Sequence, residues 1–220
     1  MKENIQPAFY PVLINLKRFP CLIVGGGKVA YRKALSLLEF HADITVISPK
    51  FCKPLMELHQ QEKIKVIKKS YSKQFILGFK IIFSATDNQE INKTVSQDCR
   101  EEGILLNVVD NTPLCDFILP ANVKRGDLVV SISTQGKAPF FTKAVKEELE
   151  KILPEEYKEV LELAAEFRKR LLKGKNKYKD QNKTKLFDKF LSINWVNILA
   201  EKGKVKSKMD IDKMLRELNL

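Results

Sequence analysis

Metal-ligating side chains are scarce in this sequence of 220 residues. Its four cysteines, Cys21, Cys52, Cys99 and Cys115, are far apart, form no Cys-x-x-Cys pair and are accompanied by only two histidines. Zinc sites and disulfide frameworks are built from cysteine or histidine residues at characteristic spacings. The sequence therefore predicts neither a metal site nor a disulfide framework.

Long apolar runs are also missing. No run approaches the roughly 20 residues that a membrane-spanning helix needs, and Met1-Lys2-Glu3-Asn4 leads into no apolar signal-peptide region. Apolar residues nevertheless make up 44% of the chain, enough to bury a sizeable core. We therefore expect a globular, cytoplasmic protein without membrane contact.

Acidic residues are outnumbered, since 39 Lys and Arg residues face 27 Asp and Glu residues for a net charge of +12. The excess is concentrated in residues 171–220, which hold 13 basic and 6 acidic side chains. Nucleic acid, a polycarboxylate substrate or a solvated lysine-rich surface would each suit this charge. The few aromatic residues of this tail suit helix packing better than base stacking, so a nucleic-acid partner is not expected.

A glycine-rich turn follows the first apolar run of strand length, residues 20–24. The spacing Gly25-x-Gly27-x-x-Ala30 fits the dinucleotide-binding fingerprint with alanine in the third place. In that pattern Gly25 makes the turn, Gly27 lets the backbone approach a pyrophosphate, and Ala30 allows close packing of helix and strand. A purely structural glycine turn would have the same appearance, so the surrounding sequence has to decide.

Apolar runs of strand length alternate with segments of helical periodicity through residue 110. Strands are expected at 20–24, 44–47, 64–67, 81–87 and 104–110, and helices at 28–40, 51–61 and 88–102. This alternation predicts an α/β fold with a Rossmann-type, doubly wound parallel sheet.

Ligands of such sheets bind beyond the carboxyl ends of the strands. The cofactor-binding candidates at those ends are Gly25, Gly27, Lys28, Val29, Ala30, Ser48, Pro49, Lys50, Thr86 and Asp87. Asp110 and Asn111 follow the fifth strand and fall at the same edge. Thr86, Asp87 and Asp110 equally suit helix capping or hydrogen bonds to loop amides, and that alternative stays open here.

The pattern changes after residue 112. A break at 113–120 is followed by a strand at 128–133 and a polar turn at 134–139. Helices are expected at 140–153, 154–172, 187–199 and 211–218, with a joint at 173–177.

Four motifs in consistent order point to a family: Cys21-Leu22-Ile23-Val24-Gly25-Gly26-Gly27-x-Val29-Ala30-x-Arg32-Lys33, Ala85-Thr86-Asp87, Asn107-Val108-Val109-Asp110 and Phe117-Ile118-Leu119-Pro120-Ala121. Together they resemble precorrin-2 dehydrogenase, the unit also found at the N-terminus of multifunctional siroheme synthases. The resemblance covers about residues 9–170, and residues 175–220 carry no signature that matches.

The resemblance implies NAD-dependent oxidation of precorrin-2 to sirohydrochlorin and, in some members, a second reaction with Fe²⁺ as substrate that gives siroheme. It also implies a homodimer held largely by the segment after the nucleotide-binding domain. The expected division is an NAD-binding Rossmann domain at 1–112, a small α+β dimerisation and substrate-cleft segment at 113–150, and a helical C-terminal domain with a basic tail at 151–220.

The family's catalytic aspartate falls on Asp110, which would act as the general base in the oxidation. The loop that lines the tetrapyrrole cleft in the family falls on residues 133–136, where some relatives have serine in place of Thr134. The substrate-binding candidates are Asn111, Ser133, Thr134, Gly136 and Lys137. Further basic residues suited to the carboxylates of this substrate are Arg32, Lys33, Lys124 and Arg125.

The sequence also bears on alternatives to this cofactor and this function. Lys50 stands where an acidic residue would often hold the ribose of NAD, so NADP is not excluded. A non-catalytic, NAD-sensing regulatory module would share the nucleotide motif. A short-chain reductase is not expected, because none of the five tyrosines has lysine four residues later.

Overall fold

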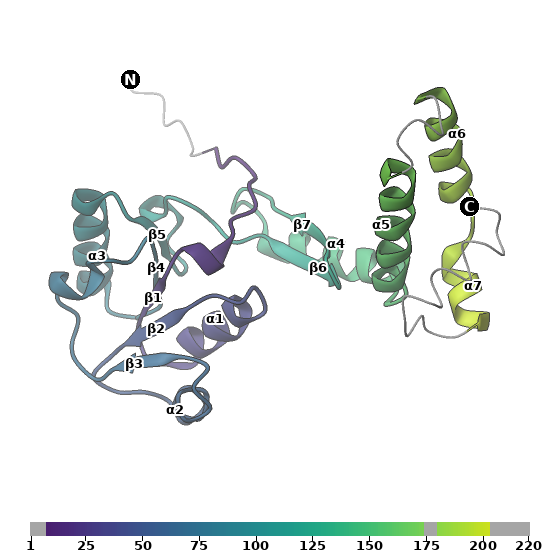
Figure 1. The fold of residues 1–220 in the computed structure, drawn as a ribbon. Helices are drawn as coiled ribbons and strands as arrows, with labels where there is room; N and C mark the ends of the chain where they lie inside the picture. The colour runs from purple at the N-terminus through teal and green to yellow at the C-terminus, as the bar shows by residue number, and fades with distance from the viewer. Residues whose placement is uncertain (1–7, 174–179, 203–220) are drawn as a thin grey trace, which may run out of the picture. The chain divides into compact units, whose positions relative to one another are not determined.

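The computed structural model of the protein describes residues 8–173 and 180–202 (Figure 1). The chain divides into two compact units, Met1–Leu119 and Pro120–Leu220. The helix expected at 211–218 and most of the joint expected at 173–177 lie outside the described residues. Within the described part, no helix is long and apolar enough to cross a membrane, and no group of three or more His, Cys, Asp or Glu side chains could hold a metal ion.

The first unit is built on a five-stranded sheet. Its strands are β1 (Cys21–Val24), β2 (Ile44–Ile47), β3 (Lys65–Ile67), β4 (Ile81–Ser84) and β5 (Leu105–Val108). All neighbours pair in parallel, in the order β3-β2-β1-β4-β5. Strands β1, β2 and β4 are buried along their whole length, which explains their continuous apolar sequences. The predicted Rossmann-type fold is confirmed.

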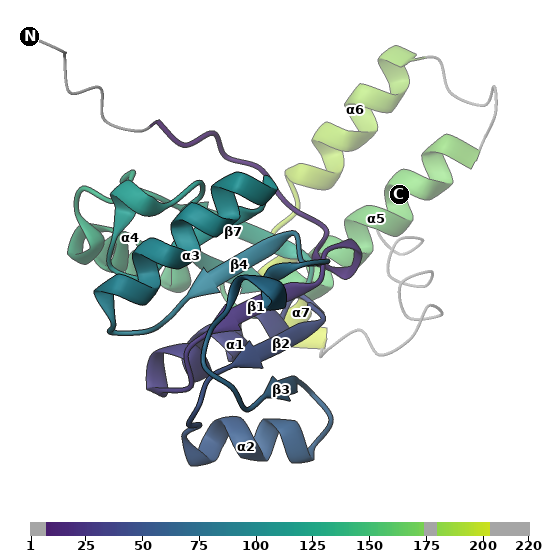
Figure 2. The ribbon, with the colours of Figure 1, turned by 90° about the vertical axis from the view of Figure 1, so that its left-hand side faces the viewer.

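Helices cover both faces of this sheet. Alternate residues of β1 face opposite sides: Cys21 and Ile23 share one core with α1 (Lys28–Leu38) and α2 (Lys53–Gln60), whereas Leu22 and Val24 share the other with α3 (Gln89–Glu102). Figure 2 shows α3 lying across β4, and α2 beside β3. Gly103, at φ +64°, ends α3 as the sequence predicts.

The outer edge of β5 is covered by the loop that follows it. The backbone N–H of Leu106 donates to Asp116 Oδ2 at 2.9 Å, and the N–H of Asp116 donates to the Leu106 carbonyl at 2.8 Å. The N–H of Val108 donates to Cys115 Sγ at 3.1 Å. Residues Cys115 and Asp116 therefore satisfy hydrogen-bonding groups that an edge strand would otherwise leave open.

The second unit begins with an antiparallel pair, β6 (Ala121–Arg125) and β7 (Leu128–Ile132), followed by α4 (Pro139–Ile152). The sequence predicts β7 but misses β6. The missed strand contains Asn122, Lys124 and Arg125, and only Val123 among its residues is buried. Its apolar signal was too weak to separate it from the preceding break.

In the described part of the second unit, α4 is followed by α5 (Tyr157–Lys173), α6 (Asp180–Leu191) and α7 (Trp195–Lys202). Phe167 stacks on Phe190 with ring centroids 5.1 Å apart, and Trp195 Nε1 donates to the Phe190 carbonyl at 2.7 Å. The predicted single helix at 187–199 is wrong, because it is interrupted between α6 and α7. There Asn194 Oδ1 accepts the N–H of Asn197 at 3.2 Å and starts α7.

A buried polar pair joins β4 to α3. Ser84 and Asn92 are almost fully buried, and the Ser84 hydroxyl donates to Asn92 Oδ1 at 2.6 Å. Asn92 Nδ2 in turn donates to the Thr86 carbonyl at 3.1 Å. The pair therefore fixes the loop that begins at the carboxyl end of β4.

We expect Ser84→Ala to lower the free energy of unfolding by about 1–3 kcal/mol, because the buried Asn92 oxygen would lose its donor. Urea denaturation followed by circular dichroism measures the change. Thr94→Ala, which removes an exposed hydroxyl from the same helix, is the control and should stay within about 0.5 kcal/mol of the parent protein. Equal losses in the two variants would contradict the structural role of the pair.

Candidate functional site

Four loops of the first unit meet where the parallel strands end. Residues 25–27 follow β1, residues 48–50 follow β2, residues 86–87 follow β4 and residues 110–111 follow β5. Because β1 lies between β2 and β4, the glycine turn occupies the centre of this edge. The helices that follow the neighbouring strands β1 and β4 lie on opposite faces of the sheet, and doubly wound sheets bind ligands at such a point.

Steric contacts explain two of the three glycines. Gly25 has φ +126°, and a Cβ there would overlap the Ala85 carbonyl after β4. A Cβ on Gly26 would overlap the Lys50 carbonyl after β2 and lie 2.8 Å from Ser48 Oγ. The requirement for Gly26 was not predicted, although it stands in the middle of the glycine run.

Gly27 differs from its neighbours, because a Cβ on it would meet no atom within 4 Å. It is the N-cap residue of α1 and, as a glycine, offers no side-chain cap to the first amides of the helix. Open space in front of uncapped helix amides fits a dinucleotide pyrophosphate, whose charge the helix end would stabilise. Ala30 is fully buried, as close packing of α1 on the sheet requires. Lys28 is exposed and Val29 half-buried beside it.

The loop after β2 is tied to the glycine turn by its backbone. The N–H of Cys52 donates to the Gly26 carbonyl at 2.7 Å. Ser48 Oγ accepts the N–H of Lys50 at 3.4 Å, so the serine hydroxyl supports its own loop. Pro49 and Lys50 are exposed.

The loop after β4 resolves the capping alternative for Asp87. Asn88, not Asp87, caps α3, because Asn88 Oδ1 accepts the N–H groups of Glu90 at 3.0 Å and Ile91 at 3.1 Å. Thr86 Oγ1 accepts the N–H of Asn88 at 3.2 Å, which gives Thr86 a structural role. The Asp87 carboxylate is exposed, and no donor among the described residues binds it.

Asp110 stands two residues beyond β5 in a left-handed conformation, with φ +59°. The neighbouring 3-10 turn (Thr112–Leu114) has Asn111 as its N-cap residue, so Asp110 does not cap it. Its carboxylate is exposed and accepts no hydrogen bond from the described part of the chain. The alternative that Asp110 serves as a helix cap is therefore wrong, and its carboxylate faces solvent at the candidate site.

Lys33 brings a positive charge to the same region. The half-buried side chain leaves α1 with Nζ 5.6 Å from the centre of the Phe83 ring. Burial lowers the pKa of Lys33 from its ordinary value, whereas the charge of Asp110 opposes that shift and the charge of Arg32 adds to it. The Lys33 ammonium and the Asp110 carboxylate therefore act on one another.

The remaining predicted substrate residues lie in the second unit, in the turn between β7 and α4. Thr134 Oγ1 accepts the N–H of Ala138 at 3.1 Å and lies 3.2 Å from Thr142 Oγ1, so it ties this turn to α4. Ser133 is exposed, and its Oγ accepts the N–H of Gln135 at 3.1 Å. Gly136, at φ +80°, and Lys137 are both exposed.

Arg125 makes structural contacts within the second unit. Its Nε donates to the Leu153 carbonyl at 2.7 Å, and a guanidinium nitrogen lies 3.3 Å from Glu155 Oε1. The guanidinium thus caps the C-terminal end of α4. This role leaves Arg125 poorly suited to anchor a substrate carboxylate.

A family model described as "Putative NAD(P)-binding" matches residues 12–121 of the chain. This match covers all five strands of the sheet and the four loops at its carboxyl edge.

Siroheme synthases are similar in sequence. That of Ruthia magnifica subsp. Calyptogena magnifica is 37% identical over 211 residues, which is 94% of this chain and 43% of that protein. That of Vesicomyosocius okutanii subsp. Calyptogena okutanii (strain HA) is 39% identical over 160 residues, 73% of this chain and 34% of that protein. The chain thus spans less than half the length of these curated relatives.

A solved structure named "SirC, precorrin-2 dehydrogenase" is similar over nearly all of both chains. The match covers 96% of this chain and 99% of the other, with a TM-score of 0.72 and 26% sequence identity.

Substitutions of Gly26 and Gly27 should have contrasting effects on stability and on NAD binding. Gly26→Ala should lower the free energy of unfolding by about 1–3 kcal/mol, because the new methyl group overlaps a backbone carbonyl. Gly27→Ala should leave stability within about 0.5 kcal/mol, yet weaken NAD binding about tenfold or more, because its methyl group occupies the space before the helix amides. Urea denaturation and isothermal titration calorimetry measure the two effects. A Gly27→Ala protein that binds NAD as tightly as its parent would refute the assignment of this space.

Proposed function

The chain belongs to the NAD(P)-binding family, and from this premise we propose that it is a precorrin-2 dehydrogenase, which uses NAD to oxidise precorrin-2 to sirohydrochlorin. The observation that carries the proposal is the exposed Asp110 carboxylate at the same sheet edge as the uncapped amides of α1. The similarity to a precorrin-2 dehydrogenase along nearly the whole chain supports it.

The cofactor half of the site is assigned to the first unit. Gly25, Gly27 and the start of α1 would hold the pyrophosphate, with Ser48, Pro49, Lys50, Thr86 and Asp87 beside it. NAD, when bound, supplies the hydride acceptor. We propose NAD as the natural cofactor, although Lys50 gives the site a cation that suits the 2′-phosphate of NADP. Binding constants measured for both dinucleotides compare the two assignments.

Asp110 is assigned the role of general base. Oxidation of a reduced tetrapyrrole releases a proton as well as a hydride, and the proton needs an acceptor within reach. A carboxylate without a protein donor retains its lone pairs for that proton. In a chelatase reaction, with Fe²⁺ as the second substrate, the same oxygens would accept pyrrole protons.

The residues assigned to substrate binding are Asn111 in the first unit and Ser133, Thr134, Gly136 and Lys137 in the second. Precorrin-2 carries carboxylates, so an exposed ammonium such as that of Lys137 suits it electrostatically. The three-part division at residues 112 and 150 and the cytoplasmic location remain part of this proposal.

Asp110→Asn tests the catalytic assignment, because asparagine tolerates the left-handed backbone that Asp110 adopts. The variant should lose turnover about 100-fold or more while keeping NAD affinity and thermal stability. Formation of sirohydrochlorin from precorrin-2 is followed by absorbance. Unchanged turnover would remove Asp110 from the reaction. If even the parent protein converts nothing with NAD or NADP, a regulatory NAD-sensing module becomes the better assignment.

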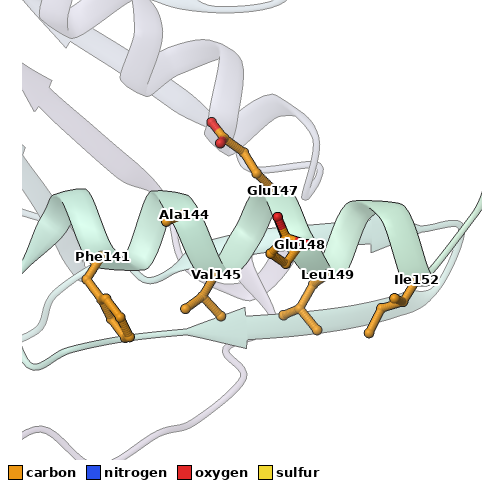
Figure 3. Close-up of a pocket in the computed structure, with 7 residues that line it drawn as sticks. All are labelled: Phe141, Ala144, Val145, Glu147, Glu148, Leu149 and Ile152. Carbon is orange, nitrogen blue, oxygen red and sulfur yellow. The ribbon is translucent and has the colours of Figure 1, made fainter.

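A homodimer is the proposed assembly, and an apolar face of α4 supports it. Phe141, Val145, Leu149 and Ile152 point to the same side of α4 (Figure 3). Together with Ala144, Glu147 and Glu148 they line a surface hollow of about 430 Å³, and Phe141 and Ile152 are 56% and 67% exposed. Covering such a face with a second copy would remove apolar surface from water.

Ile152→Asp combined with Phe141→Asp should shift the protein from dimer to monomer in sedimentation velocity, because two charges would have to be buried without partners. Lys143→Glu, at an exposed position of α4 that does not line the hollow, also changes the charge of the helix and should remain dimeric. A double variant that sediments like its parent would contradict the assignment of this face.

A further inference from the structure

Asp110 adopts a left-handed backbone conformation, but its turn follows a strand and does not lie at a helix end, where helix carbonyls can support that conformation. Left-handed residues other than glycine cost about 1–3 kcal/mol and persist where their surroundings hold them. His41 and Glu62 have similar φ values, but each lies at a helix end, where its N–H donates to a helix carbonyl. Asp110 follows a strand, and its turn is closed by a long hydrogen bond of 3.3 Å from the Asn111 N–H to the Val108 carbonyl.

The Cys115 thiol lies inside this turn and contacts both ends of it. Its sulfur accepts the N–H of Val108 at 3.1 Å, and it lies 3.2 Å from the Val108 carbonyl oxygen and 3.3 Å from that of Asn111. These distances are short for hydrogen bonds to sulfur. One side chain thus links the residues on either side of Asp110.

Cys115 is itself held in place by β5. Its neighbour Asp116 exchanges two hydrogen bonds with Leu106, and Asn107 Nδ2 donates to the Phe117 carbonyl at 3.0 Å. Asn107 Nδ2 also lies 3.6 Å from the Cys115 sulfur. These hydrogen bonds hold Cys115 in position, so its thiol can orient the turn.

The thiol keeps its proton in this setting. Burial raises the pKa of Cys115, and the charge of Asp116 adds to that shift, while the Val108 N–H, Lys33 and Asn107 oppose it. A protonated thiol can donate to a carbonyl while its sulfur accepts an N–H. The Cys115 thiol can therefore act as both a hydrogen-bond donor and an acceptor toward this turn.

We propose that Cys115 is a positioning residue for the reaction: its thiol holds residues 108–111 in the conformation that presents the Asp110 carboxylate. This inference rests on the proposed function of Asp110. Small displacements of a catalytic group are costly, since a shift of about 1 Å can lower a rate about 100-fold.

Cys115→Ala tests the proposal with two readouts. Turnover of precorrin-2 should fall about tenfold or more, with KM and NAD affinity within about twofold of the parent. Hydrogen exchange at the Val108 amide should accelerate about tenfold or more, because its acceptor is gone. Cys115→Ser restores a donor and an acceptor and should recover most of the turnover.

Cys99→Ala is the matched control. Cys99 is a fully buried residue of α3, so its truncation should destabilise the protein without changing turnover or Val108 exchange. Parent-like turnover or parent-like Val108 exchange in Cys115→Ala would overturn the proposal, as would an equal loss of turnover in Cys99→Ala.

If Cys115→Ala does not fold, the test passes to Cys115→Ser. A Cys115→Ser protein that recovers neither turnover nor slow Val108 exchange overturns the proposal, and one that recovers both supports it. A parent protein without turnover would refute the dehydrogenase function, and the exchange readout would still show whether the thiol holds the turn.

Discussion

Close backbone approach between three loops holds the carboxyl edge of the sheet together. Gly25 lies against the Ala85 carbonyl and Gly26 against that of Lys50, so the loops after β4 and β2 can pack on the turn after β1 only while both positions lack a side chain. This contact leaves Gly27 and the first amides of α1 facing open space. A site for a dinucleotide phosphate thus follows from backbone packing.

The position of the proposed catalytic residue, Asp110, depends on the edge strand β5. Cys115 and Asp116 pair with the free side of β5, and the same loop sets the turn on which Asp110 stands. Edge protection and presentation of the carboxylate are therefore two results of one set of hydrogen bonds. Lys33, half-buried on α1, adds a positive charge that acts on Asp110. The dehydrogenase account joins these features to a nicotinamide cofactor.

The sequence predicts most of the first unit, because β1, β2 and β4 are buried on both faces and read as uninterrupted apolar runs. Prediction was weaker where burial is partial: β6 was missed, and the break at residues 192–194 depends on a single asparagine cap. Gly25 and Ala30 could be assigned from their spacing together with the predicted strand and helix on either side. The contacts of Gly26 and Cys115 could not, since they join segments far apart in sequence or depend on a turn that no local pattern encodes.

We propose that this chain transfers a hydride from a reduced tetrapyrrole to NAD. Incubating the purified protein with precorrin-2 and NAD, while recording NADH and sirohydrochlorin in the same sample, tests it most directly. If the chain is a precorrin-2 dehydrogenase, the two products appear together in equal amounts. Tight NAD binding without either product, with NADP giving the same result, would contradict it.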